Sequence, residues 1–260
     1  MRLYGLIGWP LGHSFSKQYF SEKFEREGIR NARYDQFPLE KIADLPALMA
    51  QNPEILGLNV TIPYKESVIP FLHDLDDTAR TVGAVNCIKV IDNQQLVGYN
   101  SDVVGFEKSL VRWLKDEDLR SLEGLILGTG GASKAVAYVL KKLGIPFKFV
   151  SRNPKAENEI NYKELEHWGK HSQTSTLLIN ATPIGTFPRI AEMPPVPPDF
   201  FISGMFVYDL IYNPAETLLL REAKSRGCTV KNGLEMLELQ AEAAWEIWQK
   251  PDYWTCTLKN

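Results

Sequence analysis

The stretch GLILGTGGASKAVAYVLKKLG, residues 124–144, carries the strongest signal for the fold. Its first four residues are apolar and predict a buried strand, and its second half follows the spacing of an amphipathic helix. Between them, Gly128, Gly130 and Gly131 permit a tight turn that would place the helix N-terminus against a pyrophosphate group. Ser133 stands where the usual fingerprint has its third glycine. The strand, turn and helix together predict a dinucleotide-binding α/β unit.

The sequence on either side of this unit continues the alternation of strand and helix signals. The amphipathic helix VVGFEKSLVRWL precedes it, and the apolar runs in PFKFVSRN, STLLINATP and FVYDLIY follow it. Their spacing is typical of parallel strands joined by crossover helices. We interpret the proline-rich segment RIAEMPPVPPDF as a surface loop and NGLEMLELQAEAAWEIWQK as a closing helix.

Residues 1–101 alternate shorter strands and helices. The expected elements are, in order, the strand RLYGLIG, the helix KQYFSEKFEREG, the strand ARYDQFPL, a helix around Ile42 to Gln51, a strand over 58–62, a polar helix around 74–82, and a hairpin with its turn at Asp92–Asn93. In the strand over 58–62, Leu58, Val60 and Ile62 alternate with polar residues, which predicts a half-buried strand that Pro63 ends. The fold class is therefore α/β with two domains, the second being Rossmann-like and doubly wound.

Composition excludes several classes of protein. The 260 residues are 44% hydrophobic, enough for a sizeable core, and the formal net charge of −3 argues against a nucleic-acid partner. No apolar run reaches the roughly 18 residues of a membrane span, and glycine and proline interrupt the apolar N-terminus, which we expect to form a strand and not a signal peptide. Three widely spaced cysteines favour a reducing cytoplasm, and four scattered histidines predict no metal site.

Polar side chains gather where strands are expected to end. Asn59, Thr61 and Lys65 lie near the end of one strand, and comparable polar positions are Ser14, Ser16, Asn86, Asp102 and Gln240. Taken singly, each has an ordinary structural explanation: Ser14 or Ser16 fits a helix N-cap, Asp102 a cap directly before its helix, and Gln240 an exposed helix position. Taken together, these positions are not explained by ordinary structural roles.

The residues after the second strand of the nucleotide unit predict which nucleotide binds. Ser151 occupies the place of the acid that usually accepts from the ribose hydroxyls of NAD, and Arg152 follows it directly. A guanidinium can pair with a 2′-phosphate, and Lys155 lies close behind. No acidic residue occurs in this segment before Glu157. The alternative is a pair of solvated basic residues in a loop, but the missing acid and the adjacent arginine together favour NADP.

These motifs occur in the order typical of one enzyme family. They are GWPLGHSFS (8–16), NVTIPYK (59–65), GAVN (83–86), GYNSDVVG (98–105), GTGGASKA (128–135), INATPIG (179–185), DLIYNP (209–214) and NGLEMLELQA (232–241). From end to end the chain resembles the shikimate dehydrogenase family. The resemblance implies reversible NADPH-dependent reduction of 3-dehydroshikimate to shikimate in aromatic amino acid (chorismate) biosynthesis, in the cytoplasm, by a monomer or homodimer.

The resemblance also implies a domain division and residue roles. A substrate-binding domain of residues 1–101 would be completed by the C-terminal helices, 234–260, and an NADP-binding domain would span 102–233. Lys65 would transfer the proton, with Asp102 beside it. The residues implied in substrate binding are Thr61, Asn86 and Gln240 for the ring hydroxyls and Ser14, Ser16 and Tyr212 for the carboxylate. Those implied in cofactor binding are Gly128, Thr129, Gly130, Gly131, Ala132, Ser151, Arg152, the loop after Asn180, and Gly233.

Some positions depart from the family pattern. Lys17, Cys87 and Ser101 replace a common proline and two common threonines, and SRN at 151–153 replaces the usual NRT, which leaves the role of Lys155 open. Two alternatives to shikimate dehydrogenase activity stay open. One is a related dehydrogenase that acts on quinate or an aminated analogue, and the other is a catalytically silent nucleotide-binding regulator. The presence of both Lys65 and Asp102 argues against the regulator.

Overall fold

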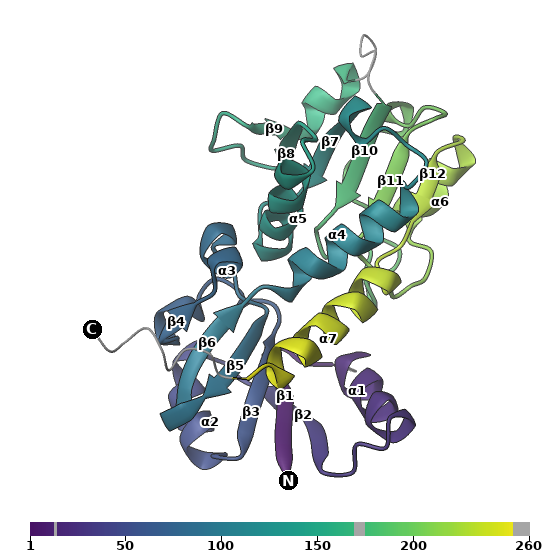
Figure 1. The fold of residues 1–260 in the computed structure, drawn as a ribbon. Coiled ribbons are helices and arrows are strands. Elements are labelled where there is room, and N and C mark those ends of the chain that lie inside the picture. The colour runs from purple at the N-terminus through teal and green to yellow at the C-terminus, as the bar shows by residue number, and fades with distance from the viewer. Residues whose placement is uncertain (13–14, 169–174, 252–260) are drawn as a thin grey trace. The chain divides into compact units, whose positions relative to one another are not determined.

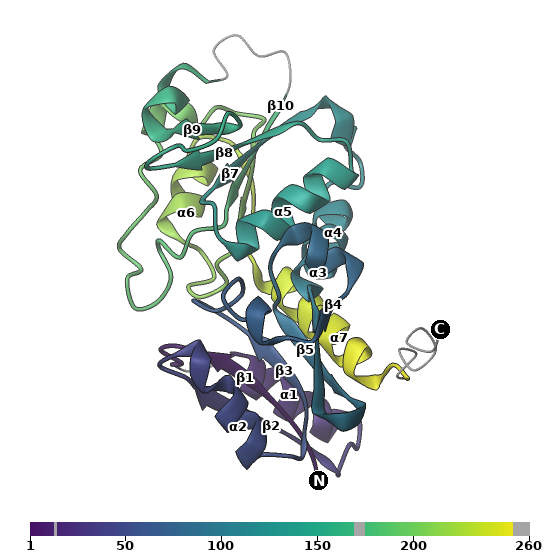
Figure 2. The same ribbon diagram turned by 90° about the vertical axis from the view of Figure 1, so that its left-hand side faces the viewer.

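The computed structural model of the protein describes residues 1–12, 15–168 and 175–251 (Figures 1 and 2). The chain forms two compact units, the first of Met1–Ser101 with Gln240–Asn260 and the second of Asp102–Leu239. Within the described ranges each unit contains a six-stranded sheet. The first boundary between the units falls after Ser101, and the second, after Leu239, falls inside the closing helix, α7 (Leu234–Gln249).

The first unit is built on a mixed sheet with the strand order β2-β1-β3-β5-β6-β4. Its strands are β1 (Arg2–Gly8), β2 (Ala32–Pro38), β3 (Ile55–Val60), β4 (Asp74–Leu75), β5 (Cys87–Ile91) and β6 (Gln95–Tyr99). β1 pairs in parallel with both β2 and β3, whereas β5 runs antiparallel to β3 and β6. The predicted hairpin is confirmed, and the short helical turn η3 (Asp92–Gln94) connects its strands.

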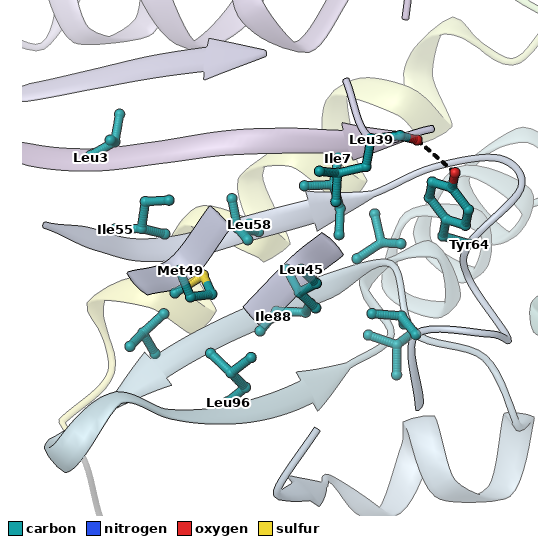
Figure 3. Packing of buried hydrophobic residues seen from close by; sticks show 14 of the residues in the cluster. Leu3, Ile7, Leu39, Leu45, Met49, Ile55, Leu58, Tyr64, Ile88 and Leu96 are labelled. Atoms are coloured by element: carbon teal, nitrogen blue, oxygen red, sulfur yellow. Dashed lines mark hydrogen bonds between the residues drawn. The ribbon is translucent and has the colours of Figure 1, made fainter. Parts of the chain in front are cut away.

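Two cores flank this sheet. The helical elements up to β5 are α1 (Phe15–Arg26), η1 (Ile42–Asp44), α2 (Leu45–Gln51), η2 (Ile69–Phe71) and α3 (Asp77–Val82). On one face, side chains of α2 pack against the apolar residues of β1, β3 and β5, as Figure 3 shows, and the Tyr64 hydroxyl donates to the Leu39 carbonyl at 2.6 Å. On the other face, aromatic residues of α1 and α7 pack around Tyr4, and the Trp248 indole donates to the carbonyl of Ile88.

The structure corrects four expectations for this unit. β3 ends at Val60, so Thr61 and Ile62 lie beyond the strand, and Ile62 is 60% exposed. Leu58, Asn59 and Val60 are all buried, because β3 lies between two other strands and is covered on both faces. The helix expected around 42–51 consists of η1 followed by α2, and the helix expected around 74–82 begins only at Asp77, after the strand β4 and the N-cap Asp76.

The second unit is built on a fully parallel sheet with the order β12-β11-β10-β7-β8-β9. Its strands are β7 (Leu122–Leu127), β8 (Phe147–Ser151), β9 (Glu159–Asn161), β10 (Ser175–Asn180), β11 (Phe206–Asp209) and β12 (Thr229–Lys231). Numbered from β7, this is the 3-2-1-4-5-6 order of dinucleotide-binding folds. β8 and β9 extend the sheet on one side of β7, whereas β10, β11 and β12 extend it on the other side. Such folds bind their ligand at this switch point, between β7 and β10.

Helices cover both faces of this sheet, which confirms the doubly wound α/β class. α4 (Ser101–Trp113) and α5 (Gly131–Lys142) lie on one face, and α6 (Leu218–Ser225) lies on the other (Figure 2). The remaining short turns are η4 (Leu119–Ser121), η5 (Tyr162–His167) and η6 (Pro198–Phe200). β9, α6 and β12 gave no clear signal in the sequence, because β9 and β12 are three residues long with one apolar residue each and α6 is only eight residues long.

Helix length and hydropathy bear on membrane association. Over the described ranges, we find no helix that combines the length and the apolar character needed to cross a bilayer.

Candidate functional site

A buried polar cluster lies in the first unit, where β5 begins and α7 passes. The Asn86 side-chain amide donates to the Ser101 hydroxyl at 2.9 Å and to the Gln240 side-chain oxygen at 3.4 Å. In return, the Asn86 oxygen accepts from the Ser101 backbone N–H at 2.6 Å. Asn86 and Ser101 are 3% and 0% exposed, so these groups depend on one another for hydrogen bonds. The structure thus joins two residues predicted to bind the substrate, Asn86 and Gln240, through one that was not singled out for a role.

The cluster continues across the sheet to β2 and α1. The Tyr34 hydroxyl donates to the Asn59 side-chain oxygen at 2.8 Å, and the Asn59 amide donates to the Asn86 carbonyl at 3.3 Å. Burial raises the pKa of Tyr34 well above its ordinary value, and the hydrogen bond with Ser16 lowers that pKa by less. The neutral phenol therefore links Ser16 to Asn59. Tyr34 gave no signal in the sequence beyond a strand position.

Lys65 and Thr61 lie in the turn that follows β3. The Tyr64 N–H donates to the Thr61 carbonyl at 2.9 Å, and the Lys65 carbonyl accepts from the Val85 N–H at 2.7 Å. Val85 directly precedes Asn86, so the backbone holds Lys65 beside the polar cluster. The Thr61 N–H donates to the Ile7 carbonyl at 3.0 Å, which ties the start of the turn to β1.

The remaining predicted substrate and catalytic residues are placed as follows. Ser14 lies outside the described residues. Asp102 is the second residue of α4, because the helix begins at Ser101, so the expectation that Asp102 directly precedes its helix is wrong. Gln240 is 8% exposed, so its expected alternative as an exposed helix residue is also wrong. Asp102 and Tyr212 belong to the second unit, and burial raises the pKa of Tyr212.

In the second unit, the glycine-rich turn has the backbone that its sequence predicts. Gly128 has φ +97°, a conformation that favours glycine, and its N–H donates to the Val150 carbonyl at 2.9 Å. Gly130 is the N-cap residue of α5 and has no side chain to cap it. A Cβ on Gly130 would meet nothing within 4 Å, so the first turn of the helix is open on this side. Thr129 is exposed in the turn, and Gly131 and Ala132 begin α5.

These features fit a dinucleotide. The first backbone N–H groups of a helix have no partner inside the helix and carry a partial positive charge, so they bind phosphate oxygens. The Ser133 hydroxyl is buried and has no hydrogen-bond partner within the described part of the chain. Its oxygen would lie 3.4 Å from a Cβ on Gly128, directly beneath the turn. The Ser133 side chain, at the position of the third glycine, is therefore accommodated in a buried site close to the turn.

The end of β8 combines basic residues with an unexpected acid. Ser151 is the last residue of β8, and Arg152 and Lys155 are exposed in the loop behind it. The Ser151 hydroxyl donates to a carboxylate oxygen of Glu159 at 3.2 Å, and the Lys155 backbone N–H donates to the same oxygen at 3.0 Å. Glu159 could not be predicted from the sequence, because eight positions separate it from Ser151 and only the pairing of β8 with β9 brings the two side chains together.

A buried carboxylate organises the ends of β10 and β11. Asp209 accepts from the Asn180 amide at 2.9 Å, from the Ile211 N–H at 3.0 Å and from the Thr217 hydroxyl at 2.6 Å. Burial raises the pKa of Asp209 from 3.8 to about 6. These bonds hold the loop after Asn180 and the segment that carries Tyr212. Asp209 lies in a motif quoted above, yet no role was predicted for it.

Gly233 closes the set of predicted cofactor residues in the second unit. Its N–H donates to the Ile211 carbonyl at 3.0 Å. A Cβ at this position would lie 1.9 Å from the Leu210 carbonyl oxygen, so only glycine lets the two backbones approach this closely. The same loop that Asp209 organises thus also fixes the entry to α7.

Fold and site define a class: a nucleotide-binding α/β protein with a second unit that carries a buried polar cluster. Residues 6–88 match the family described as the shikimate dehydrogenase substrate binding domain. The shikimate dehydrogenase (NADP(+)) of Carboxydothermus hydrogenoformans is 38% identical over 264 residues, covering 95% of this chain and 91% of the relative. The chain belongs to the shikimate dehydrogenase family.

Solved structures agree with this assignment. The crystal structure of shikimate dehydrogenase 1 from Peptoclostridium difficile is 36% identical, with a TM-score of 0.84 and coverage of 97% of this chain and 94% of that one. The enzyme from Thermus thermophilus, solved in complex with NADP(H) and shikimate, is 29% identical, with a TM-score of 0.80 and coverage of 97% and 95%. The similarity therefore extends through both units.

Proposed function

We propose that this protein is an NADP-dependent oxidoreductase that reversibly reduces 3-dehydroshikimate to shikimate in aromatic amino acid (chorismate) biosynthesis. The observation that carries the proposal is family membership along the whole chain, with 95% of it covered at 38% identity by an NADP-dependent shikimate dehydrogenase. A match confined to the nucleotide-binding unit would support only cofactor use. A match that also includes residues 6–88 supports the substrate as well.

In this proposal the two units divide the work. The first, with the C-terminal part of α7, binds the substrate, and the second binds NADP. The polar cluster of the first unit supports its role, since Asn86 and Gln240 present amides that hydrogen-bond to each other in a buried setting. A ring with several hydroxyls needs donors and acceptors held in fixed positions, and a buried, mutually bonded cluster provides them.

Lys65 is proposed to move the proton. As the ketone is reduced, its oxygen gains negative charge and requires a proton, which an ammonium group can donate. In the reverse direction the neutral amine accepts the proton from the alcohol. Asp102 is proposed to hold the ammonium by its negative charge. The backbone bonds of the turn after β3 support this role for Lys65, because they hold its Cα beside the cluster.

The other predicted residues are proposed to orient the substrate and cofactor. Thr61, Asn86 and Gln240 would bond the ring hydroxyls, and Ser14, Ser16 and Tyr212 would hold the carboxylate. The N-terminus of α5 and residues 128–132 would hold the diphosphate, with Ser151, Arg152 and Gly233 at other parts of the cofactor. Bound NADPH would supply the hydride to the carbonyl carbon.

The test is an absorbance assay at the NADPH band with the purified protein. Shikimate and quinate are each offered with NADP+ and NAD+, which gives a comparison of four specificity constants. The proposal expects the highest kcat/KM for shikimate with NADP+. A higher kcat/KM for quinate would mean that quinate, and not shikimate, is the preferred substrate. Nucleotide binding without turnover of either compound would favour the silent regulator.

Location and assembly are separate parts of the proposal. We infer a cytoplasmic location, supported by the odd number of cysteines and by Cys87 and Cys228, which form no disulfide within the described ranges. The expected assembly is a monomer or a homodimer, which light scattering of the purified protein distinguishes.

A further inference from the structure

The end of β8 carries a hydrogen-bond arrangement with a consequence for cofactor choice. β9 pairs in parallel with β8, with Phe149 opposite Glu159 and Ser151 opposite Asn161. From that position the Glu159 side chain reaches the Ser151 hydroxyl, and one carboxylate oxygen accepts both from Ser151 at 3.2 Å and from the Lys155 N–H at 3.0 Å. A carboxylate therefore lies at the end of β8, although the chain has no acid directly there.

This contact determines what the Ser151 hydroxyl can offer a ligand. A hydroxyl has one proton to donate and two lone pairs to accept with. Since the Ser151 proton points to Glu159, its oxygen can still accept a hydrogen bond but cannot donate one. A ribose 2′-hydroxyl is a donor and suits this arrangement. A 2′-phosphate is almost entirely ionised near neutral pH and offers acceptors, so it gains nothing from Ser151.

The charges at this strand end act in opposite directions. Arg152 and Lys155 are cationic and exposed, and they favour a 2′-phosphate. The half-buried Glu159 carboxylate is anionic, makes no ion pair within the described residues, and disfavours the phosphate. The NADP preference of this protein is then a balance between two cations and one anion, and not the result of cations alone.

We propose that Glu159 is a specificity-determining residue that limits the preference for NADP over NAD, by holding the Ser151 proton and by placing a negative charge beside the 2′ position. The inference rests on the proposed cofactor use. It acts through Ser151 as well as through charge, so removing the carboxylate should release a hydroxyl donor for the phosphate. Glu159 is thus a positioning residue that weakens NADP binding while leaving NAD binding nearly unchanged.

The experiment measures binding directly. Isothermal titration calorimetry gives Kd for NADP+ and NAD+ with the full-length protein and with Glu159→Gln and Glu159→Ala. The ratio Kd(NAD+)/Kd(NADP+) is expected to rise about three- to tenfold in both variants, through tighter NADP+ binding. Adding Ser151→Ala to Glu159→Ala should reverse part of the increase, because the released hydroxyl is then absent.

Glu157→Gln is the matched control. Glu157 is exposed two residues earlier in the same loop, and its substitution makes the same change in net charge. If Glu157→Gln raises the ratio as much as Glu159→Gln, the effect is general charge and the inference fails. A ratio that stays constant or falls in both Glu159 variants shows that the carboxylate only orders the loop, which also overturns it. A native protein that binds neither nucleotide overturns the proposed cofactor use itself, and with it this inference.

Discussion

The polar cluster of the first unit and the glycine turn of the second are assembled in different ways. The cluster joins side chains from β2, β3, the start of β5, the start of α4 and α7, positions as far apart as Tyr34 and Gln240. The turn is one continuous segment between β7 and α5, and the binding groups proposed for it are backbone N–H groups. A site of the first kind is sensitive to side-chain substitutions, whereas a site of the second kind is sensitive to changes in backbone conformation.

The largest expected effect concerns Lys65, beside the side-chain cluster. Lys65→Ala should lower kcat for shikimate oxidation about 100- to 10,000-fold, because the variant has no group to transfer the proton. KM should change little if Lys65 contributes mainly in the transition state. The exposed Lys41, in the same unit, provides the control, and Lys41→Ala should retain full activity. A raised KM with an unchanged kcat would make Lys65 a binding residue only.

The second prediction tests whether the second unit relies on backbone groups alone. Its Asp209 has a pKa raised from 3.8 to about 6 by burial, so the folded state holds the proton more tightly than the unfolded chain. Its contribution to stability is therefore greatest below the unfolded pKa and is lost as the pH rises through about 6. Asp209→Asn removes this dependence. The difference in unfolding free energy between native protein and variant should change by about 3 kcal/mol across that range.

Urea unfolding at several pH values measures this difference. Asp199→Asn is the control, because the Asp199 side chain is 98% exposed in the same unit and forms a surface ion pair with Arg226. The difference for Asp199→Asn should stay flat with pH. A flat difference for Asp209→Asn as well would mean that the three donors around its carboxylate offset the cost of burial.

The third prediction concerns the cationic side of the nucleotide site. Arg152→Ala should weaken NADP+ binding about 10- to 100-fold, the range of a charge-assisted hydrogen bond, and leave NAD+ binding nearly unchanged. Arg120 precedes β7, at the end of the strand opposite the glycine turn, so Arg120→Ala controls for net charge. Unchanged NADP+ affinity in Arg152→Ala would mean that another cationic residue binds the 2′-phosphate, with Lys155 as the first candidate.

The contrast between the two regions also explains what could be predicted from the sequence. The strand over residues 2–8 and the glycine turn were predicted correctly, because local apolar runs and glycine spacing determine them. The end of β3 was not, because the alternation of apolar and polar residues continues through Thr61 and Ile62, beyond the last strand residue, Val60. Glu159 and Ser101 gave no signal of their own, since their contacts with Ser151 and Asn86 depend on strand pairing and on side-chain packing.

The smallest expected effect tests whether Ser101 matters to the cluster through its hydroxyl. Ser101 stands where the family commonly has threonine, and its hydroxyl and backbone N–H both bond the Asn86 side chain. Ser101→Ala should raise KM for shikimate about 2- to 10-fold with a small change in kcat, because Asn86 loses a partner that orients its amide toward Gln240. Ser101→Thr keeps the hydroxyl and should behave like the native protein. Steady-state kinetics with shikimate distinguish the two variants: if alanine and threonine raise KM equally, packing around this fully buried side chain governs the cluster and its hydrogen bonds do not.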